Sequence, residues 1–416
     1  MTRAFATMAE RYERPAWVRR INAMATAVGG ARRLVPLDAA SLVEEALASI
    51  GGGPAGDFGD PAWRTRFDSL VAALDATNMH VVGRLLTREE LLRSLRTRLL
   101  LARELERKPG ILDERIEAPL IVTGPARSGT TITFELLWLD PALRGPTAWE
   151  ALHPVALPEG GGADARLAAS ECEQELWADI QPEFAAIHEL RSDLPVECVT
   201  LTAPCFCGPH WPMVAQMGAY AGDIEEMYRF HRRILQALQH GTPRRTWLLK
   251  TPAHLMTLDL LHATYPDAWI VQTHRDPAKT MPSTVSTTAM VQWMRSDGVD
   301  AATLSAAVEG MFGFALNNVA ELRRKKASPL RFVDVHFQEL MKDPVETLRR
   351  AYGVMGREFT DAHAERIRRY LAEKPKGKFG THRYAPEDWG FSAQTLREHL
   401  KPYIEYFGVA LEESGA

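Results

Sequence analysis

The chain has 416 residues, of which 46% are hydrophobic and 25% are charged, as in an ordinary globular protein. A net charge of −4 argues against broad nucleic-acid binding, and we expect no nucleic-acid partner. The N-terminus lacks the apolar core of a secretory signal, and no 18-residue apolar run occurs. We therefore expect a cytoplasmic protein without a membrane-spanning helix, and peripheral membrane contact is left open.

Residues 1–115 are predicted to form a helical accessory region. The stretches 39–50 and 87–105 carry apolar residues at the three- and four-residue spacing of amphipathic helices. The Gly-Gly-Gly-Pro cluster at 51–54 separates helices. This region is interpreted as a lid or a partner surface, and the alternative is that it only thickens the fold.

Residues 116–416 are predicted to form an α/β domain, because short apolar runs alternate with helical patterns. This order favours a P-loop-like parallel sheet flanked by helices, with ligands bound beyond the carboxyl ends of the strands. Strands are predicted at 120–124, 247–250, 268–273 and 330–337, and helices at 129–139, 254–263 and 339–352.

The segment 119–131 has the order of a phosphate-binding loop: an apolar strand, a glycine-bearing loop and a helix start. Gly124 and Gly129 have the spacing of a nucleoside-triphosphatase loop, but Thr130 stands where such a loop carries its lysine. The cation of the loop is Arg127 instead. The pattern therefore disfavours ATP with Mg²⁺, and the structural alternative is a tight turn with an N-capping serine.

This loop resembles the 5′-phosphosulfate loop of sulfotransferases that use 3′-phosphoadenosine-5′-phosphosulfate (PAPS). Those enzymes carry Pro-Arg-Ser-Gly-Thr-Thr or its lysine form, and Pro125 lies one position early here. The matching residues, which the resemblance assigns to donor binding, are Arg127, Ser128, Gly129, Thr130 and Thr131. Three further motifs resemble those of bacterial sulfotransferases, including mycobacterial members, that are related to the tyrosylprotein enzymes. They are Trp-Glu-x-x-His-Pro at 149–154, Leu-Lys-Thr-Pro-x-His-Leu at 249–255 and His-Arg-Asp-Pro at 274–277.

A second segment of the resemblance runs from Thr273 to Ser283. The family has an arginine at a strand end and a serine eight residues later, and together they hold the 3′-phosphate of the nucleotide. Arg275 and Ser283 have this spacing. A guanidinium fork and a hydroxyl are suitable donors for a phosphate. The alternative is that Arg275 pairs with Asp276 or another carboxylate.

A third segment, 374–384, resembles the Lys-Gly-x-x-Gly loop that closes over the nucleotide. Lys376, Gly377 and Gly380 match it, and Lys378 adds a cation. Pro375 departs from the family, in which an arginine often precedes the lysine. The alternative is a solvated basic turn.

The resemblance also assigns catalytic roles. Lys250, after a predicted strand, matches a family lysine that reaches the sulfuryl group, and Arg127 is the second cation of the transfer. The position of the histidine base of the cytosolic enzymes is Pro252 here. Glu150 is the favoured base, because the tyrosylprotein and carbohydrate branches use a glutamate in this region. His153 and His254 are the alternative bases, and the structural alternative for Glu150 is an N-capping or salt-bridging carboxylate.

These motifs predict a PAPS-dependent sulfotransferase that transfers a sulfuryl group to an acceptor hydroxyl and releases 3′-phosphoadenosine 5′-phosphate. No metal is expected, since no acidic cluster that could hold Mg²⁺ stands out. The Met- and aromatic-rich stretch 206–228 indicates either core or a pocket for an apolar acceptor such as a lipid, sterol or phenol. The alternatives are a non-catalytic nucleotide or lipid binder and a P-loop small-molecule kinase. A homodimer is the default expectation.

Overall fold

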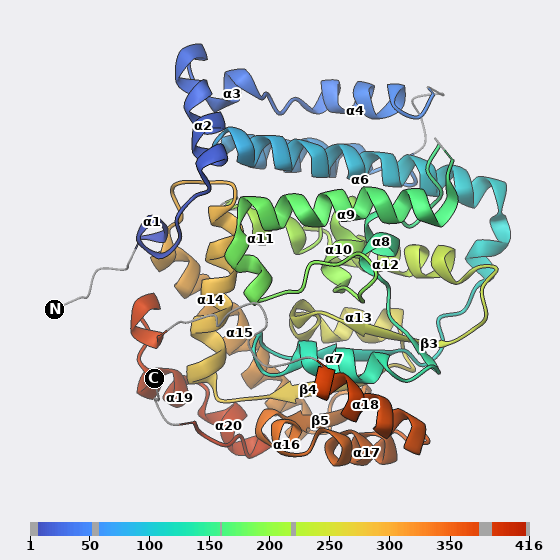
Figure 1. The fold of residues 1–416 in the computed structure, drawn as a ribbon. Coiled ribbons are helices and arrows are strands. Elements are labelled where there is room, and N and C mark those ends of the chain that lie inside the picture. The colour runs from blue at the N-terminus through green and yellow to red at the C-terminus, as the bar shows by residue number, and fades with distance from the viewer. Residues whose placement is uncertain (1–6, 52–57, 159, 218–221, 374–384, 413–416) are drawn as a thin grey trace.

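The computed structural model describes residues 7–51, 58–158, 160–217, 222–373 and 385–412. At its centre is a five-stranded sheet in the order β2-β3-β1-β4-β5, in which every pairing is parallel. Helices flank the sheet (Figure 1), so the predicted fold class is confirmed. The strands are β1 (Leu120–Thr123), β2 (Leu143–Arg144), β3 (Thr246–Lys250), β4 (Trp269–His274) and β5 (Arg331–His336).

Successive side chains of the central strands enter two different cores. Ile121 and Leu249 belong to one apolar cluster, whereas Leu120, Val122 and Leu248 belong to another. This alternation follows from the two-residue period of a strand. Because both faces of the sheet are covered, the strands are apolar runs, which is why the sequence pattern located them.

The described residues among the first hundred lie mainly in helices. The long helix α6 packs on α4 at the top of Figure 1, away from the sheet. One apolar cluster includes Leu42, Leu95, Ile121 and Leu249, so the core is continuous between this region and the sheet. The division of the chain at residue 115 stays a prediction. The helices are α1 (Met8–Arg11), α2 (Ala16–Met24), α3 (Ala31–Leu34), α4 (Ala39–Ala48), α5 (Trp63–Ala76) and α6 (Val81–Arg107).

The helices that follow surround the sheet and fill the space between it and α6. They are α7 (Thr130–Trp138), α8 (Ala148–Leu152), α9 (Gly162–Ile180), α10 (Cys198–Thr202), α11 (His210–Val214), α12 (Ile224–Gln239), α13 (Leu258–Thr264), α14 (Pro277–Trp293), α15 (Ala301–Arg324), α16 (Phe337–Lys342), α17 (Pro344–Val354), α18 (Asp361–Glu373), α19 (Ala393–His399) and α20 (Lys401–Phe407). Short 3-10 turns are η1 (Ala25–Val28), η2 (Pro109–Asp113), η3 (Pro182–Ala186), η4 (Ala203–Cys205), η5 (Pro252–Met256) and η6 (Pro386–Trp389).

Two predicted helices are each divided in the structure. The stretch 339–352 contains the junction of α16 and α17, where Asp343 caps the second helix and Pro344 opens it. Proline cannot continue a helix but suits the first position of a new one. The stretch 254–263 is likewise divided at Thr257, between η5 and α13. The two-residue strand β2 was not predicted, because its pattern is too short to read.

The strand order determines where a ligand can bind. Strand β1 lies between β3 and β4, so the segments that follow these three strands leave the same edge of the sheet. Here the chain order reverses across the sheet, which is where open α/β sheets bind their ligands. Among the described residues, we find no helix with the length and apolar character needed to span a bilayer.

Candidate active site

The loop after β1 has the backbone conformation of an anion-binding turn. Gly124, Arg127 and Gly129 all have positive φ, at 144°, 64° and 94°. A Cβ on Gly124 would lie 2.3 Å from Oγ1 of Thr273, so only glycine fits against β4 there. Gly129 precedes α7, whose first turn provides unpaired N–H groups and the positive end of the helix dipole.

Ser128 holds this loop in place. Its buried hydroxyl donates to the carbonyl oxygen of Pro125 at 2.6 Å and lies 2.5 Å from Oγ1 of Thr273. The turn is therefore tied to both of its own ends and to β4. The serine of the motif thus shapes the loop, while its neighbours form the adjoining surface.

A cavity of about 600 Å³ opens at this edge of the sheet. The structure brings together there five residues predicted to bind the donor and the predicted catalytic lysine, namely Arg127, Gly129, Thr130, Thr131, Arg275 and Lys250. Beyond them the walls become apolar, with Phe184, Ile187, Leu190, Leu194, Met213 and Val291. The cavity therefore joins a cationic end to an apolar interior.

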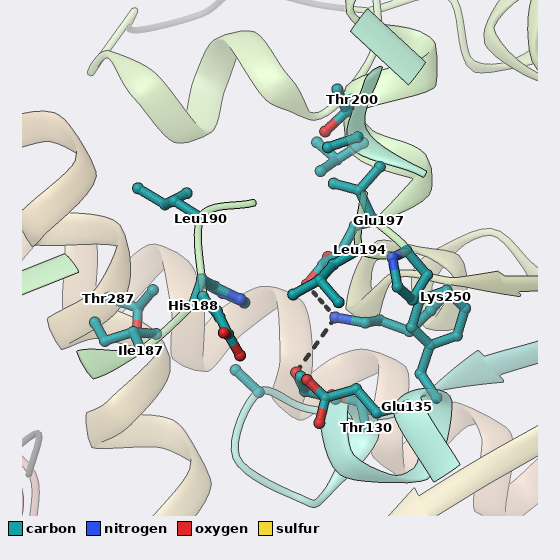
Figure 2. A pocket seen from close by; sticks show the side chains of 18 of the residues that line it. Thr130, Glu135, Ile187, His188, Leu190, Leu194, Glu197, Thr200, Lys250 and Thr287 are labelled. Carbon is teal, nitrogen blue, oxygen red and sulfur yellow. Dashed lines mark hydrogen bonds and ion pairs between the residues drawn. The ribbon is translucent and has the colours of Figure 1, made fainter. Parts of the chain in front are cut away.

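Lys250 ends β3 and is almost completely buried, with 3% of its side chain exposed. Its Nζ donates to Oε1 of Glu197 at 2.5 Å and to Oγ1 of Thr131 at 3.3 Å (Figure 2). Burial alone would raise the pKa of the Glu197 carboxyl, but the charge and hydrogen bond of Lys250, together with His188 and Thr251, lower it. The predicted catalytic lysine is thus one half of an ion pair in the cavity wall.

Glu197 is positioned by an extended segment that runs along the start of α8. The N–H of Ala148 donates to the carbonyl oxygen of Leu194 at 2.9 Å, and that of Val196 donates to Pro146 at 2.8 Å. Glu197 then leads into α10. Sequence analysis did not select Glu197, because 53 residues separate it from Lys250 and no motif marks it.

His188 is a second residue that the motifs did not indicate. Figure 2 shows its side chain and that of Lys250 pointing into the same part of the cavity. Burial, together with the charges of Lys250 and Arg127, lowers the pKa of His188 to about 4. This histidine is therefore neutral at neutral pH.

Arg275 follows β4 and lines the cavity, as the motif predicts. Its Nε and Nη2 donate to the two carboxylate oxygens of Glu412 at 2.7 and 2.8 Å. Its Nη1 donates to the carbonyl oxygen of Arg127 at 2.9 Å. Arg275 thus pairs with a carboxylate near the C-terminus, whereas the adjacent Asp276 pairs with Arg397.

Ser283, the predicted partner of Arg275, lies on α14 and is fully buried. It is not part of the cavity wall, and its hydroxyl has no hydrogen-bond partner among the described residues. The predicted closing loop with Lys376, Gly377 and Lys378 lies outside the described residues. The joint role of these residues in nucleotide binding stays a prediction.

Glu150, the favoured base, lies in α8 and outside the cavity wall. Its Oε1 accepts from Arg144 at 2.7 Å, and its Oε2 accepts from the N–H and hydroxyl of Thr147 at 3.0 and 3.1 Å. The carboxylate thus makes the capping and ion-pair contacts of the structural alternative. Its assignment as base stays a prediction.

The two alternative bases also have partners elsewhere. Nε2 of His153 lies 2.9 Å from Glu173, and Nδ1 of His254 lies 2.9 Å from the hydroxyl of Tyr228. Burial lowers the pKa of His254 to about 3. Neither histidine lines the cavity.

The far end of the cavity is polar and includes residues of the N-terminal helical region. Glu90 and Arg93 of α6 line it, together with Glu173 of α9 and His210 of α11. Nε of Arg93 lies 2.8 Å from Glu173, which joins α6 to α9. Of the Met- and aromatic-rich stretch, Phe206, Trp211 and Tyr228 are core, whereas Met213 lines the cavity.

The described residues include no group of three or more His, Cys, Asp or Glu side chains suited to hold a metal ion. The arrangement instead has cations and N–H groups at one end of a cavity whose interior is apolar. This geometry suits an anionic donor and an apolar acceptor.

Residues 119–361, more than half of the chain, match the Sulfotransferase family, and the protein belongs to that family. The match begins at β1 and ends at the start of α18, so it includes the whole sheet. It confirms the family that the motifs predicted.

Among curated proteins, the chain is similar to omega-hydroxy-beta-dihydromenaquinone-9 sulfotransferase Stf3 of Mycobacterium tuberculosis and Mycobacterium bovis. The identity is 26% over 310 residues, which cover 70% of this chain and 75% of the relative. Among solved structures, sulfotransferase STF9 from Mycobacterium avium matches with a TM-score of 0.78 and 25% identity, covering 89% of this chain and 97% of that one. Sulfotransferase STF1 from M. tuberculosis matches with a TM-score of 0.70 and 26% identity, covering 86% of this chain and 97% of that one.

Proposed function

We propose that this protein transfers a sulfuryl group from PAPS to the hydroxyl of an apolar acceptor. The observation that carries the proposal is the meeting of the loop 124–131, Lys250 and Arg275 at one end of a single cavity. The anionic phosphosulfate would bind to the N–H groups of the loop and to Arg127, and the 3′-phosphate to Arg275. Ser283 and the segment 376–378 belong to the same proposed nucleotide site.

Sulfuryl transfer, like phosphoryl transfer, depends on in-line positioning and on charge stabilisation rather than on covalent catalysis. Lys250 and Arg127 would stabilise the charge that develops on the sulfuryl and leaving oxygens. In this proposal no metal takes part.

A lipid is the acceptor class that we propose. The apolar residues between the cationic and polar ends of the cavity support it, because they would bind a chain or ring system rather than a sugar. The curated relative named for an omega-hydroxylated menaquinone derivative also supports it. Phenols and sterols would fit the same chemistry.

The proposal is tested by following ³⁵S from labelled PAPS into long-chain alcohols, sterols and phenols. We expect labelled product and 3′-phosphoadenosine 5′-phosphate in equal amounts, without added divalent metal. Lys250→Met should lower turnover about 100- to 1,000-fold, the range for loss of one group that stabilises developing charge, and leave nucleotide affinity within a few-fold. Full turnover by Lys250→Met would exclude the role given to Lys250. PAPS that binds tightly but transfers to none of these acceptors would favour a binding protein.

A further inference from the structure

The ion pair between Lys250 and Glu197 lies in the wall of the cavity. Both residues line it, and their charged atoms are 2.5 Å apart. The lysine is 3% exposed, so its ammonium depends on a nearby anion for its charge to be tolerated. Glu197 supplies that anion in the structure.

We propose that Glu197 is the general base that takes the proton from the acceptor hydroxyl, and that the bound donor prepares it by drawing Lys250 away. This inference rests on the proposed function and adds a role for a residue that the family motifs do not mark. It also gives the ion pair a purpose beyond holding the lysine.

The physical argument is an exchange of partners. The sulfuryl group of the donor is anionic, and it competes with Glu197 for the ammonium of Lys250. When Lys250 turns to the sulfuryl oxygens, the carboxylate loses its counter-charge and gains an anionic neighbour. Both changes raise the pKa of a carboxyl, so Glu197 becomes a stronger base when the donor is in place.

The other groups that face Glu197 do not replace the lost charge. His188 is neutral at neutral pH, since its pKa is about 4. Burial raises the pKa of the adjacent Cys198 thiol to about 12, and Thr251 contributes only a neutral hydrogen bond. Arg127 acts on His188 and would itself be engaged by the donor. Lys250 is therefore the charge that controls Glu197.

The step balances in protons and electrons. A lone pair of the acceptor oxygen forms the new O–S bond while the acceptor O–H proton passes to Glu197. The S–O bond to the 5′-phosphate breaks, and its electron pair stays on the nucleotide, near Lys250. Glu197 then releases the proton to solvent and pairs with Lys250 again.

Geometry favours Glu197 over the residues predicted earlier. Glu150 lies outside the cavity wall and has both oxygens engaged by Arg144 and Thr147. His153 and His254 also lie outside it. Glu197 is the carboxylate that contacts Lys250, the lysine at which we expect the donor to bind. It lies on the side of that lysine where the cavity becomes apolar.

A calorimetric titration with PAPS tests the exchange without any acceptor. Binding is measured at pH 5.5 in two buffers of different ionisation enthalpy, which gives the number of protons taken up. The wild type should take up more protons than Glu197→Gln, because the pKa of the Glu197 carboxyl rises when Lys250 leaves it. Protons released by the 3′-phosphate cancel in this difference. Glu175→Gln, an exposed charge change on α9, should behave like the wild type.

Turnover of two probe acceptors separates a base from a merely structural group. Glu197→Gln should lose about 100-fold or more with a long-chain alcohol, which must give up its proton, because a general base contributes about 100- to 10,000-fold. With 4-nitrophenol at pH 9, where the phenol is already ionised, the loss should be less than about 10-fold. Equal losses with both acceptors would mean that Glu197 only holds Lys250.

The two proposals fail in different ways. A wild type that does not bind PAPS would overturn the proposed function. PAPS binding with the same proton uptake in wild type and Glu197→Gln would overturn only the role of Glu197. Turnover lost in Glu150→Gln and retained in Glu197→Gln would return the base to Glu150.

Discussion

At the scale of single residues, two cations of the site, Lys250 and Arg275, already have anionic partners within the protein. Lys250 pairs with Glu197 and Arg275 pairs with Glu412, in both cases through hydrogen-bonded contacts. Each carboxylate lies where an oxygen anion of the proposed donor would bind. In the proposed function, donor binding therefore exchanges one anion for another. The ion pairs that must open make donor binding less favourable.

The contact between Arg275 and Glu412 predicts that removing the charge of Glu412 strengthens nucleotide binding. Glu412→Gln should tighten binding of 3′-phosphoadenosine 5′-phosphate by about 2- to 5-fold, because a partly exposed ion pair that competes with the nucleotide is worth up to about 1 kcal/mol. Titration calorimetry measures the change, and Glu405→Gln, on the exposed face of α20, is the control. Weaker binding by Glu412→Gln would mean that Glu412 orients Arg275 for the nucleotide.

At the scale of elements, α6 makes an unusually close contact with the turn that follows α14. A Cβ on Gly83 would lie 2.2 Å from the carbonyl oxygen of Arg295, so the glycine lets the two backbones meet. The guanidinium of Arg295 donates to Oε1 of Glu90 at 2.7 Å, and His210 lies 3.2 Å from Oε2. Glu90 and Arg295 are both buried, so this ion pair links the N-terminal helices to the sheet domain.

This link predicts a dependence of stability on pH. Burial would raise the pKa of Glu90, but Arg295 and His210 lower it to about 2. Because the pKa of Glu90 is lower in the folded than in the unfolded state, its ionised carboxylate stabilises the fold above about pH 4.5. This stabilisation, about 3 kcal/mol, is lost as the pH falls toward about 2. Glu90→Gln should therefore cost about 3 kcal/mol at pH 7 and much less at pH 3.

Denaturant unfolding at several pH values checks this prediction. Glu321→Gln, which removes an exposed ion pair with Arg324, should change the free energy of unfolding by less than about 1 kcal/mol at every pH. A loss in Glu90→Gln that is the same at pH 7 and pH 3 would contradict the account of Glu90.

The sequence could predict the features that depend on local patterns, but not the contacts that form only in the tertiary fold. Four of the five strands, the loop around Gly124 and the strand-end positions of Lys250 and Arg275 follow from local patterns in the sequence, whereas β2 is too short to be recognised. No local pattern marks Glu197, His188 or Glu412, because each residue reaches the site only through the tertiary fold. The junction at Pro344 was missed because the apolar period continues across it, although the proline itself marked it.

At the scale of the whole molecule, the N-terminal helices do more than cover the sheet. Glu90 and Arg93 of α6 line the far end of the cavity, although the family match starts only at residue 119. The cationic end of the cavity, where we propose that the donor binds, is built from the matched region, and the polar far end includes residues outside it. Acceptor choice is thus expected to depend on parts of the chain that carry no donor motif.

The measurement that tests the central claim most directly is a calorimetric titration with 3′-phosphoadenosine 5′-phosphate, beside ATP with Mg²⁺. The account predicts that the bisphosphate binds and Mg-ATP does not, and that Arg275→Ala weakens the bisphosphate at least about 10-fold, the loss of a charge-assisted hydrogen-bonded contact to a phosphate. Preferential binding of Mg-ATP, unaffected by Arg275→Ala, would contradict it and indicate a phosphoryl-transfer enzyme instead.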